Sequence, residues 1–177
     1  MKKTFLSLIA VVAAFMFVLP ANAQKASIYA TYGGYTQMDA TDMHDDWDHV
    51  KTAWGAVNVG VDFRIGSRFR LGPSYTFSST CTKGGKHASD IFYHVIMLNA
   101  KYDYYRTGIF SLYAHLGLGA DISHMCPKWD DSYNKGYFAF QASPIGMRAQ
   151  LGNGFNFMAE VGFGAQGLVQ LGFGYDF

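Results

Sequence analysis

Outside its first residues, the 177-residue sequence has no long apolar runs. After residue 24, every apolar stretch is well below the ~18 residues expected of a membrane-spanning helix. Only 4 prolines and 2 cysteines are present, and two cysteines in an exported chain fit an oxidising compartment. The formal net charge is +1, so no basic excess indicates a nucleic-acid partner.

Aromatic residues and glycines are abundant. The chain is 50% hydrophobic and 17% aromatic, and it contains 20 glycines. Aromatic and glycine residues without helix-length apolar segments are typical of a sheet protein whose outer face meets an apolar medium.

The N-terminus has the features of a targeting signal. Lys2 and Lys3 precede an apolar run over 5–19, and Ala21-Asn22-Ala23 matches a small-x-small cleavage pattern. We predict a cleavable signal peptide over 1–23. A retained anchor is the alternative, but the apolar run is short for a span of ~20 residues.

The remaining residues, 24–177, alternate between apolar and polar side chains and predict a single all-β domain. In Phe69–Ser78 every odd position is apolar and every even one is small or polar, as in a strand with two unlike faces. Pro73 and Pro144 interrupt this pattern, and we expect a bulge at each. Eight strands are expected, over 27–35, 55–64, 69–78, 92–104, 110–119, 138–150, 155–163 and 169–177.

The expected connections differ in length at the two ends of the sheet. Short turns are predicted at 66–67, 106–108, 152–154 and 164–167, and long polar loops at 36–52, 79–90 and 121–136. An even number of strands of about ten residues, with short turns at one end and long loops at the other, is typical of outer-membrane barrels. We therefore predict an eight-stranded antiparallel up-and-down transmembrane β-barrel.

The polar face of the predicted strands carries both signs of charge, with glycines between them. Because the interior of an eight-stranded barrel is just wide enough to be filled by side chains, opposite charges are expected to pair there and plug the lumen. The apolar face would then meet lipid. The predicted lumen network consists of Asp62, Arg64, Arg70, Lys101, Asp103, His115, Arg148, Glu160 and Asp176.

The last strand carries the most specific resemblance. It alternates apolar residues with polar or small ones and ends in phenylalanine. With this strand, the chain resembles the small OmpA-like and OmpX-like barrels of Gram-negative outer membranes. Pro144–Arg148 and 155–164 are also similar to the last strands of these barrels. The resemblance implies contact with outer-membrane lipid and a C-terminal signal for the barrel-assembly machinery, formed by Val169, Leu171, Phe173, Tyr175 and Phe177.

The long loops contain two further candidate sites. The first loop is dense in aspartate and histidine, but it lacks the spacing of a calcium loop, so we favour a solvated acidic loop and predict no metal or cofactor. Cys81 and Cys126 lie in the second and third loops, which are expected to emerge side by side, so a disulfide between them is predicted. Free thiols are the alternative. The acidic and histidine positions are Asp39, Asp42, His44, Asp45, Asp46, Asp48 and His49.

We predict a structural or surface-interaction protein that is not an enzyme. The alternatives are a lipid-A-modifying enzyme and a narrow transporter. His94, His115 and His124, with Ser111 and Ser123, suggest the enzyme, but the local signature of the deacylase family is absent and His115 falls on the interior face. A narrow transporter for hydrophobic ligands would need an apolar lumen, and the charged residues predicted for the lumen argue against it. The loop residues expected to contact an extracellular ligand are Trp47, Lys83, Lys86, Lys128 and Trp129.

Overall fold

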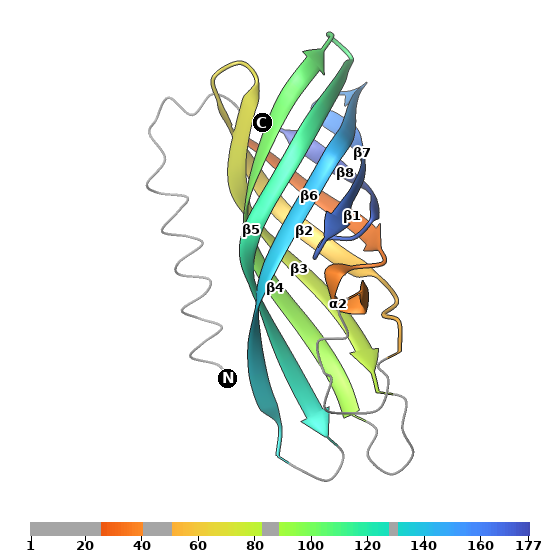
Figure 1. The fold of residues 1–177 in the computed structure, drawn as a ribbon. Helices are drawn as coiled ribbons and strands as arrows, with labels where there is room; N and C mark the ends of the chain where they lie inside the picture. Colours follow the sequence, from red (N-terminus) through yellow and green to blue (C-terminus); the bar gives the residue numbers. More distant parts are fainter. Residues whose placement is uncertain (1–25, 41–50, 83–88, 128–130) are drawn as a thin grey trace.

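The chain folds into a closed antiparallel barrel in which each strand pairs with its neighbours in sequence and β1 closes on β8 (Figure 1). The computed structural model describes residues 26–40, 51–82, 89–127 and 131–177. A short helix, α2 (Gln37–Ala40), follows β1. Within these residues no helix is long and apolar enough to cross a membrane. The strands are β1 Ala26–Gly34, β2 Ala56–Ile65, β3 Phe69–Cys81, β4 Ser89–Arg106, β5 Phe110–Pro127, β6 Tyr133–Gly152, β7 Phe155–Gly164 and β8 Val169–Asp176.

This architecture confirms the predicted eight-stranded up-and-down barrel. The predicted signal peptide over 1–23 lies outside the described residues, so it stays a prediction.

The strands place apolar side chains outward. On β8, Leu171 and Phe173 are 52% and 61% exposed, whereas Gln170, on the opposite face of the strand, is buried. The same alternation runs along β1, β2, β3 and β7. Exposed apolar side chains around the whole barrel would be unfavourable in water, so this surface suits hydrocarbon.

Tight turns connect the strands at one end of the barrel, called here the turn end. Gly66, at the β2–β3 turn, has φ of 74°, and Asn153, at the β6–β7 turn, has φ of 51°. Glycine and asparagine tolerate this left-handed backbone, as two-residue and three-residue hairpin turns require. Short turns mark the periplasmic end of such barrels.

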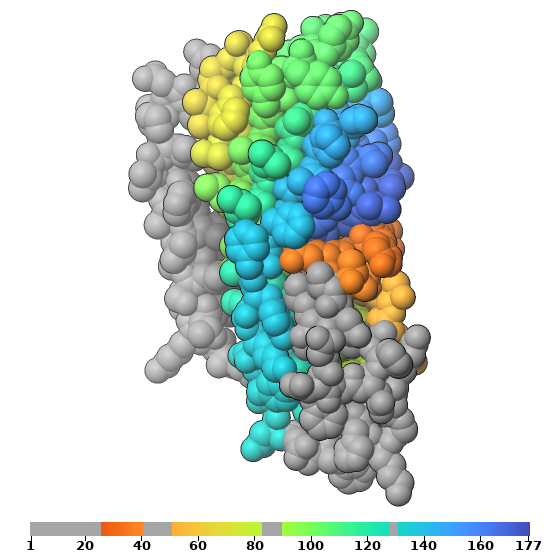
Figure 2. All heavy atoms as spheres, in the orientation of Figure 1, coloured from red at the N-terminus to blue at the C-terminus, as the bar shows by residue number. Residues whose placement is uncertain are grey.

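At the opposite end, β4, β5 and β6 extend beyond β1, β2, β7 and β8, and β3 runs beside β4 as far as Cys81, which pairs with Asp90 (Figures 1 and 2). They contain 18, 18 and 20 residues, whereas β1, β2, β7 and β8 contain 8 to 10. β6 begins at Tyr133, but its ladder with β7 begins only at Gln141. We call residues 89–97, 119–127 and 133–141 the outer wall.

The predicted loops over 79–90 and 121–136 were therefore too long. At the far end of the outer wall, polar side chains such as Asp90 and Asn134 lie on the outward face, whereas Ile91 and Met125 face inward and are buried. Beyond the lipid the outward face meets water, so the polar side chains that suggested loops belong to strands.

The two predicted bulges have different outcomes. At Pro144 the β6 register shifts against both β5 and β7, which confirms the bulge. At Pro73 the prediction is wrong, because β3 keeps one register with β2 and β4 across this residue. Pro73 pairs with Leu98 of β4, and no β2–β3 pair forms at Pro73 itself. Proline lacks a backbone N–H, so β3 accommodates it by omitting this pair with β2, and no extra residue is inserted.

Candidate functional site

Charged side chains from β2, β3 and β4 meet inside the barrel. Lys101 Nζ lies 2.9 Å from Asp62 Oδ2, and Arg70 Nη2 lies 2.5 Å from Asp103 Oδ1. Arg70 Nη1 is also 3.8 Å from Asp62 Oδ2. All four side chains are at most 2% exposed. Two cations therefore face two acids, which is the balance that burial of charge demands.

A second pair lies on β5 and β7. His115 Nδ1 is 2.9 Å from Glu160 Oε2, and the Tyr113 hydroxyl donates to Glu160 Oε1 at 2.7 Å. The other ring nitrogen of His115 lies 3.0 Å from Asn99 Oδ1. Both ring nitrogens of His115 therefore have an oxygen partner within the barrel. Together with the four charged residues above, His115 and Glu160 form what we call the lumen cluster.

Two tyrosine rings cover the cations of the lumen cluster. Lys101 Nζ lies 3.7 Å from the centre of the Tyr29 ring, and Arg70 Cζ lies 4.8 Å from that of Tyr113. Glycines make room for these rings. A Cβ atom at Gly60 would lie 2.5 Å from the Tyr29 ring, and one at Gly146 would lie 2.4 Å from the Tyr113 ring. Glycines on the inward face thus accommodate the aromatic partners of the charges as well as the charges themselves.

The remaining members of the predicted network lie nearer the turn end. Arg148 forms an ion pair with Asp176, and Gln150 Nε2 donates to Asp176 Oδ2 at 3.0 Å. Arg64 differs from the prediction. It lies one position from the end of β2, is partly exposed and has no ion pair among the described residues, because the strand leaves the enclosed lumen here.

A layer of uncharged polar side chains lies next to the lumen cluster, and our sequence analysis missed it. Ser74 Oγ accepts from Asn99 Nδ2 at 2.7 Å and from Gln166 Nε2 at 2.9 Å. The Gln166 backbone N–H donates to Gln141 Oε1 at 2.9 Å. Ser74, Asn99 and Gln141 sit at inward positions of the alternation, so the pattern that found the charges was sufficient to find them.

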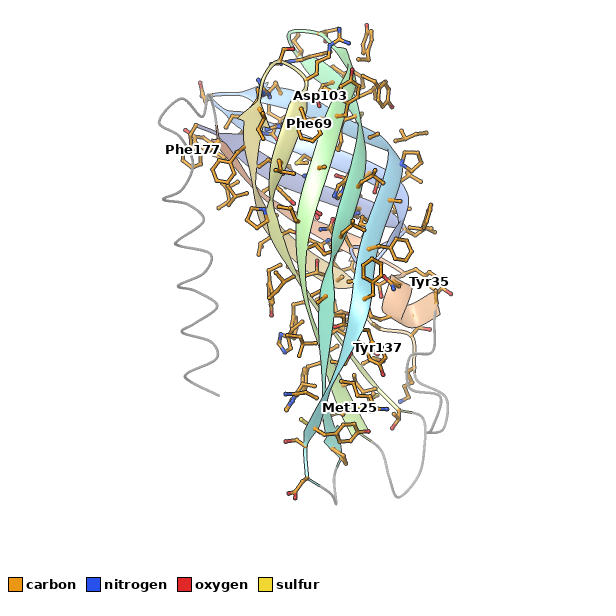
Figure 3. All side chains as sticks on the ribbon, turned by 60° about the vertical axis from the view of Figure 1, so that its left-hand side comes forward. Tyr35, Phe69, Asp103, Met125, Tyr137 and Phe177 are labelled. Atoms are coloured by element: carbon orange, nitrogen blue, oxygen red, sulfur yellow. The ribbon has the colours of Figure 1, made fainter. Side chains whose placement is uncertain are left out.

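The inner face of the outer wall carries a cluster of buried apolar side chains, together with the buried polar residues Asp121, Ser123 and Gln141. Ile91, Tyr93 and Met125 are at most 2% exposed and belong to a cluster that Met38 of α2 also joins. The lining of the barrel thus becomes more apolar along the outer wall. Figure 3 shows Met125 and Tyr137 on this wall, far from Asp103 at the turn end.

The predicted disulfide is absent, because Cys81 and Cys126 are both free. Cys81 pairs with Asp90 from one side of β4, and Cys126 pairs with Asp90 from the other. With neighbouring strands about 4.8 Å apart, residues on either side of a strand are too distant for a disulfide, which needs Cα atoms within about 7 Å. The prediction failed because β4 extends between the two cysteines.

The histidines and serines considered for catalysis do not meet. His94 Nδ1 lies 2.7 Å from the Tyr75 hydroxyl, and His124 Nδ1 lies 2.6 Å from Asn134 Oδ1. Ser123 Oγ donates to Asp121. Ser111 pairs with Arg148 near the turn end and lies on a different part of β5 from His124. No serine–histidine hydrogen bond is present in the parts of the chain that the structure describes.

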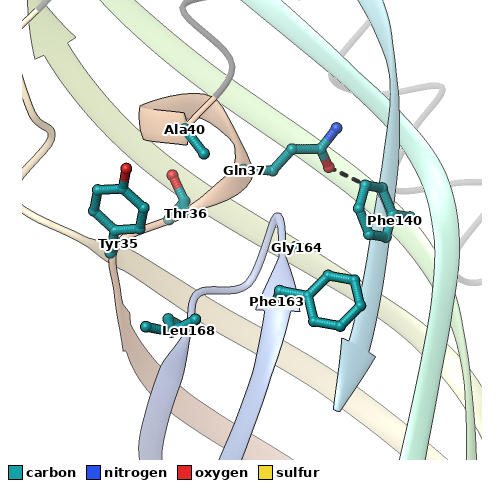
Figure 4. Close-up of a pocket in the computed structure, with 8 residues that line it drawn as sticks. All are labelled: Tyr35, Thr36, Gln37, Ala40, Phe140, Phe163, Gly164 and Leu168. Carbon is teal, nitrogen blue, oxygen red and sulfur yellow. Dashed lines mark hydrogen bonds between the residues drawn. The ribbon is translucent and has the colours of Figure 1, made fainter.

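An apolar pocket of about 170 Å³ opens beside α2, where β6 loses its β7 partner (Figure 4). Phe140 and Phe163 form one side, with ring centres 5.9 Å apart. Gln37 bridges α2 to β6: its Oε1 accepts from the Phe140 N–H at 3.3 Å and its Nε2 donates to the Phe138 carbonyl at 3.2 Å. The helix thereby covers the exposed edge of β6 at this point.

Most of the first loop lies outside the described residues, as do Trp47, Lys83, Lys86, Lys128 and Trp129. Asp39 is described, and its carboxylate accepts from the Thr36 and Ala53 backbone N–H groups at 2.8 and 2.6 Å. It therefore holds the α2 turn. Within the described ranges no group of three or more metal-ligating side chains is present.

Comparison with known proteins gives a family and a fold. The model of the outer membrane protein beta-barrel domain family matches residues 8–177. No curated protein matches. A crystal structure of Ail, the attachment invasion locus protein of Yersinia pestis, in complex with the heparin analogue sucrose octasulfate is 16% identical, with a TM-score of 0.53. A second crystal structure of Ail is 17% identical, with a TM-score of 0.50. Each match covers 86% of this chain and 98% of the Ail chain.

Proposed function

Because the chain belongs to the outer membrane protein beta-barrel domain family, we propose that it acts at the cell surface by binding an extracellular ligand, and that it is neither an enzyme nor a channel. It is an integral β-barrel of a Gram-negative outer membrane. The observation that carries the proposal is the outer wall, in which β4, β5 and β6, with β3 beside β4, extend beyond β1, β2, β7 and β8 at the end opposite the turns.

The lumen supports a binding role over a transport role. The lumen cluster pairs its charges internally, the uncharged polar side chains around Ser74 bond to one another, and the outer wall packs Ile91, Tyr93 and Met125 together with Met38 of α2. These three layers support a plugged lumen, since an eight-stranded barrel has little interior to spare. The wall, by contrast, ends in the connections 82–88 and 128–132, whose sequences contain Lys83, Lys86, Lys128 and Trp129.

A sulfated polysaccharide is the first ligand class to test. A solved barrel of the same fold was crystallised with a heparin analogue. In this chain the lysines of the second and third loops supply the positive charge that sulfate groups require.

The test is binding of the barrel, reconstituted in nanodiscs, to immobilised heparin at low and high salt. We expect binding at low salt that weakens at high salt. The triple variant Lys83→Gln/Lys86→Gln/Lys128→Gln should lose this binding. Arg106→Gln, at the opposite end, is the matched control and should bind like the parent protein. Equal binding by the triple variant would reject these loops as the site.

The two alternative functions, a narrow transporter and a lipid-A-modifying enzyme, are tested separately. In planar bilayers we expect insertion without conductance, and stepwise currents would favour the narrow transporter. Lipid A from cells with and without the protein should have the same mass spectrum, and a mass change would favour the enzyme.

We also propose that the last strand is read by the barrel-assembly machinery. Val169, Leu171 and Phe173 project outward from β8 and are 48–61% exposed, and Phe177 is 71% exposed. Deleting Phe177 should slow assembly in cells, whereas folding of the purified chain into detergent should change little. Normal assembly of the deletion variant would contradict this role.

A further inference from the structure

All the arginines of the chain lie toward the turn end of the barrel. Lys51 and Lys135, by contrast, lie toward the outer wall, where Lys51 bonds to the end of β3 and Lys135 lies on β6. The arginine side chain binds phosphate and carboxylate groups through two parallel N–H donors, which lysine cannot do. The arginines are Arg64, Arg68, Arg70, Arg106 and Arg148.

Two of them have acidic partners within the protein. Arg70 pairs with Asp103, and Arg148 pairs with Asp176, so the acids near this end are already engaged. For Arg64, Arg68 and Arg106, no ion pair occurs within residues 26–40, 51–82, 89–127 and 131–177. We call these three residues the arginine rim.

The arginine rim is a local cluster on two adjacent turns. Arg106 Nη1 donates to the Ser67 carbonyl at 3.0 Å, which ties the β4–β5 turn to the β2–β3 turn. The Arg68 carbonyl in turn accepts from the Asp103 N–H at 2.8 Å. Arg64 lies on the β2 side of the same β2–β3 turn, opposite Arg70. Arg68 and Arg106 are exposed, so most of their N–H donors are available to a ligand.

Exposed apolar side chains surround the arginine rim. Ile65 is 52% exposed, Tyr102 48%, Tyr105 53% and Ile109 71%. Figure 3 shows Phe69 at this end of the barrel, close to Asp103. Tyrosines at this level form the aromatic girdle that marks the headgroup region of a membrane.

We propose that the arginine rim binds the headgroup phosphate of an anionic phospholipid in the periplasmic leaflet, with the acyl chains along the neighbouring tyrosines and isoleucines. An amphiphile explains both halves of the site, because guanidinium groups bind phosphate while the exposed apolar residues need hydrocarbon. A soluble acidic polymer would use only the charges. This site is separate from the ligand-binding role proposed for the outer wall.

The test uses the barrel in phosphatidylcholine bilayers with spin-labelled phosphatidylglycerol or phosphatidylcholine, and compares the fraction of each lipid that the protein immobilises. We expect a preference for phosphatidylglycerol that falls as salt is added. The variant Arg64→Gln/Arg68→Gln/Arg106→Gln should lower the relative association constant on the order of tenfold. Lys51→Gln/Lys135→Gln, at the other end, is the control and should keep the preference.

Faster migration of unboiled than boiled samples on a detergent gel will establish that each variant is folded. A conservative variant with lysine at all three positions should retain part of the preference, because it keeps the charge but loses the two-donor geometry. An unchanged preference in the glutamine variant, or an equal loss in the Lys51/Lys135 control, would overturn the proposal. Absence of any preference in the parent protein would also overturn it and would point to a soluble acidic partner.

Discussion

At the scale of single residues, the interior is organised by charge balance. Asp62 has two cationic neighbours, Lys101 and Arg70, while Arg70 also contacts Asp103. Removing one member leaves a buried charge without a partner, which costs more than the pair itself contributes. Single substitutions in this group should therefore be more damaging than paired ones.

The variant Asp62→Asn should lower the free energy of unfolding by about 3–5 kcal/mol, because Lys101 loses its ion-pair partner in a buried site. Urea-dependent folding into phospholipid vesicles measures this. Asp176→Asn is the control: its side chain is 22% exposed, so water compensates and the loss should be smaller. The double variant Asp62→Asn/Lys101→Met should recover part of the stability, and a double variant worse than the single one would contradict the charge-balance argument.

Both cysteines should react as free thiols. Cys81 and Cys126 are partly exposed and separated by β4, so a maleimide should label both in the folded protein without prior reduction. Mass spectrometry counts the labels. Labelling only after treatment with a reductant would show that the predicted disulfide forms after all.

At the scale of the strands, glycines permit close approach of neighbouring backbones. A Cβ atom at Gly172 of β8 would lie 2.1 Å from the Ala30 carbonyl oxygen of β1, which is far inside van der Waals contact. This contact lies at the seam where the first and last strands close the barrel. The seam therefore depends on a residue without a side chain.

The variant Gly172→Ala should lower stability by about 1–3 kcal/mol, because β1 and β8 must move apart. Vesicle folding in urea measures this as well. Gly136→Ala is the matched control, since no atom lies within 4 Å of a Cβ there. Equal effects at the two positions would reject the steric explanation.

At the scale of the whole molecule, the barrel is divided along its axis. Toward the turn end it has an apolar outside and a charged inside, and the far end of the outer wall has buried Ile91 and Met125 inside and polar Asp90 and Asn134 outside. These polar outward positions follow from the surrounding medium, because hydrocarbon gives way to water at that level.

The folded protein should therefore behave as a closed membrane barrel. An unboiled sample should migrate faster on a detergent gel than a boiled one, since a hydrogen-bonded closed sheet resists detergent at room temperature. Identical migration, or a monomer freely soluble without detergent, would contradict the architecture.

Much of this organisation was predictable from local patterns. Strand number, turn positions and the inward charges follow from an alternation with a period of two, which one strand displays by itself. The bulge at Pro144 was found because the alternation changes phase there. The register at Pro73, the length of β4 and the isolation of Arg64 were not predictable, since each depends on how far neighbouring strands extend.

The sequence by itself determined the barrel and the side chains that fill it, because each strand must separate an apolar face from a polar one. Only the tertiary structure decided which residues meet: Asp62 with Lys101, Tyr29 over Gly60, and Arg106 beside the β2–β3 turn. Those contacts depend on register and on the stagger between strands distant in sequence, and no local pattern of residues encodes that stagger.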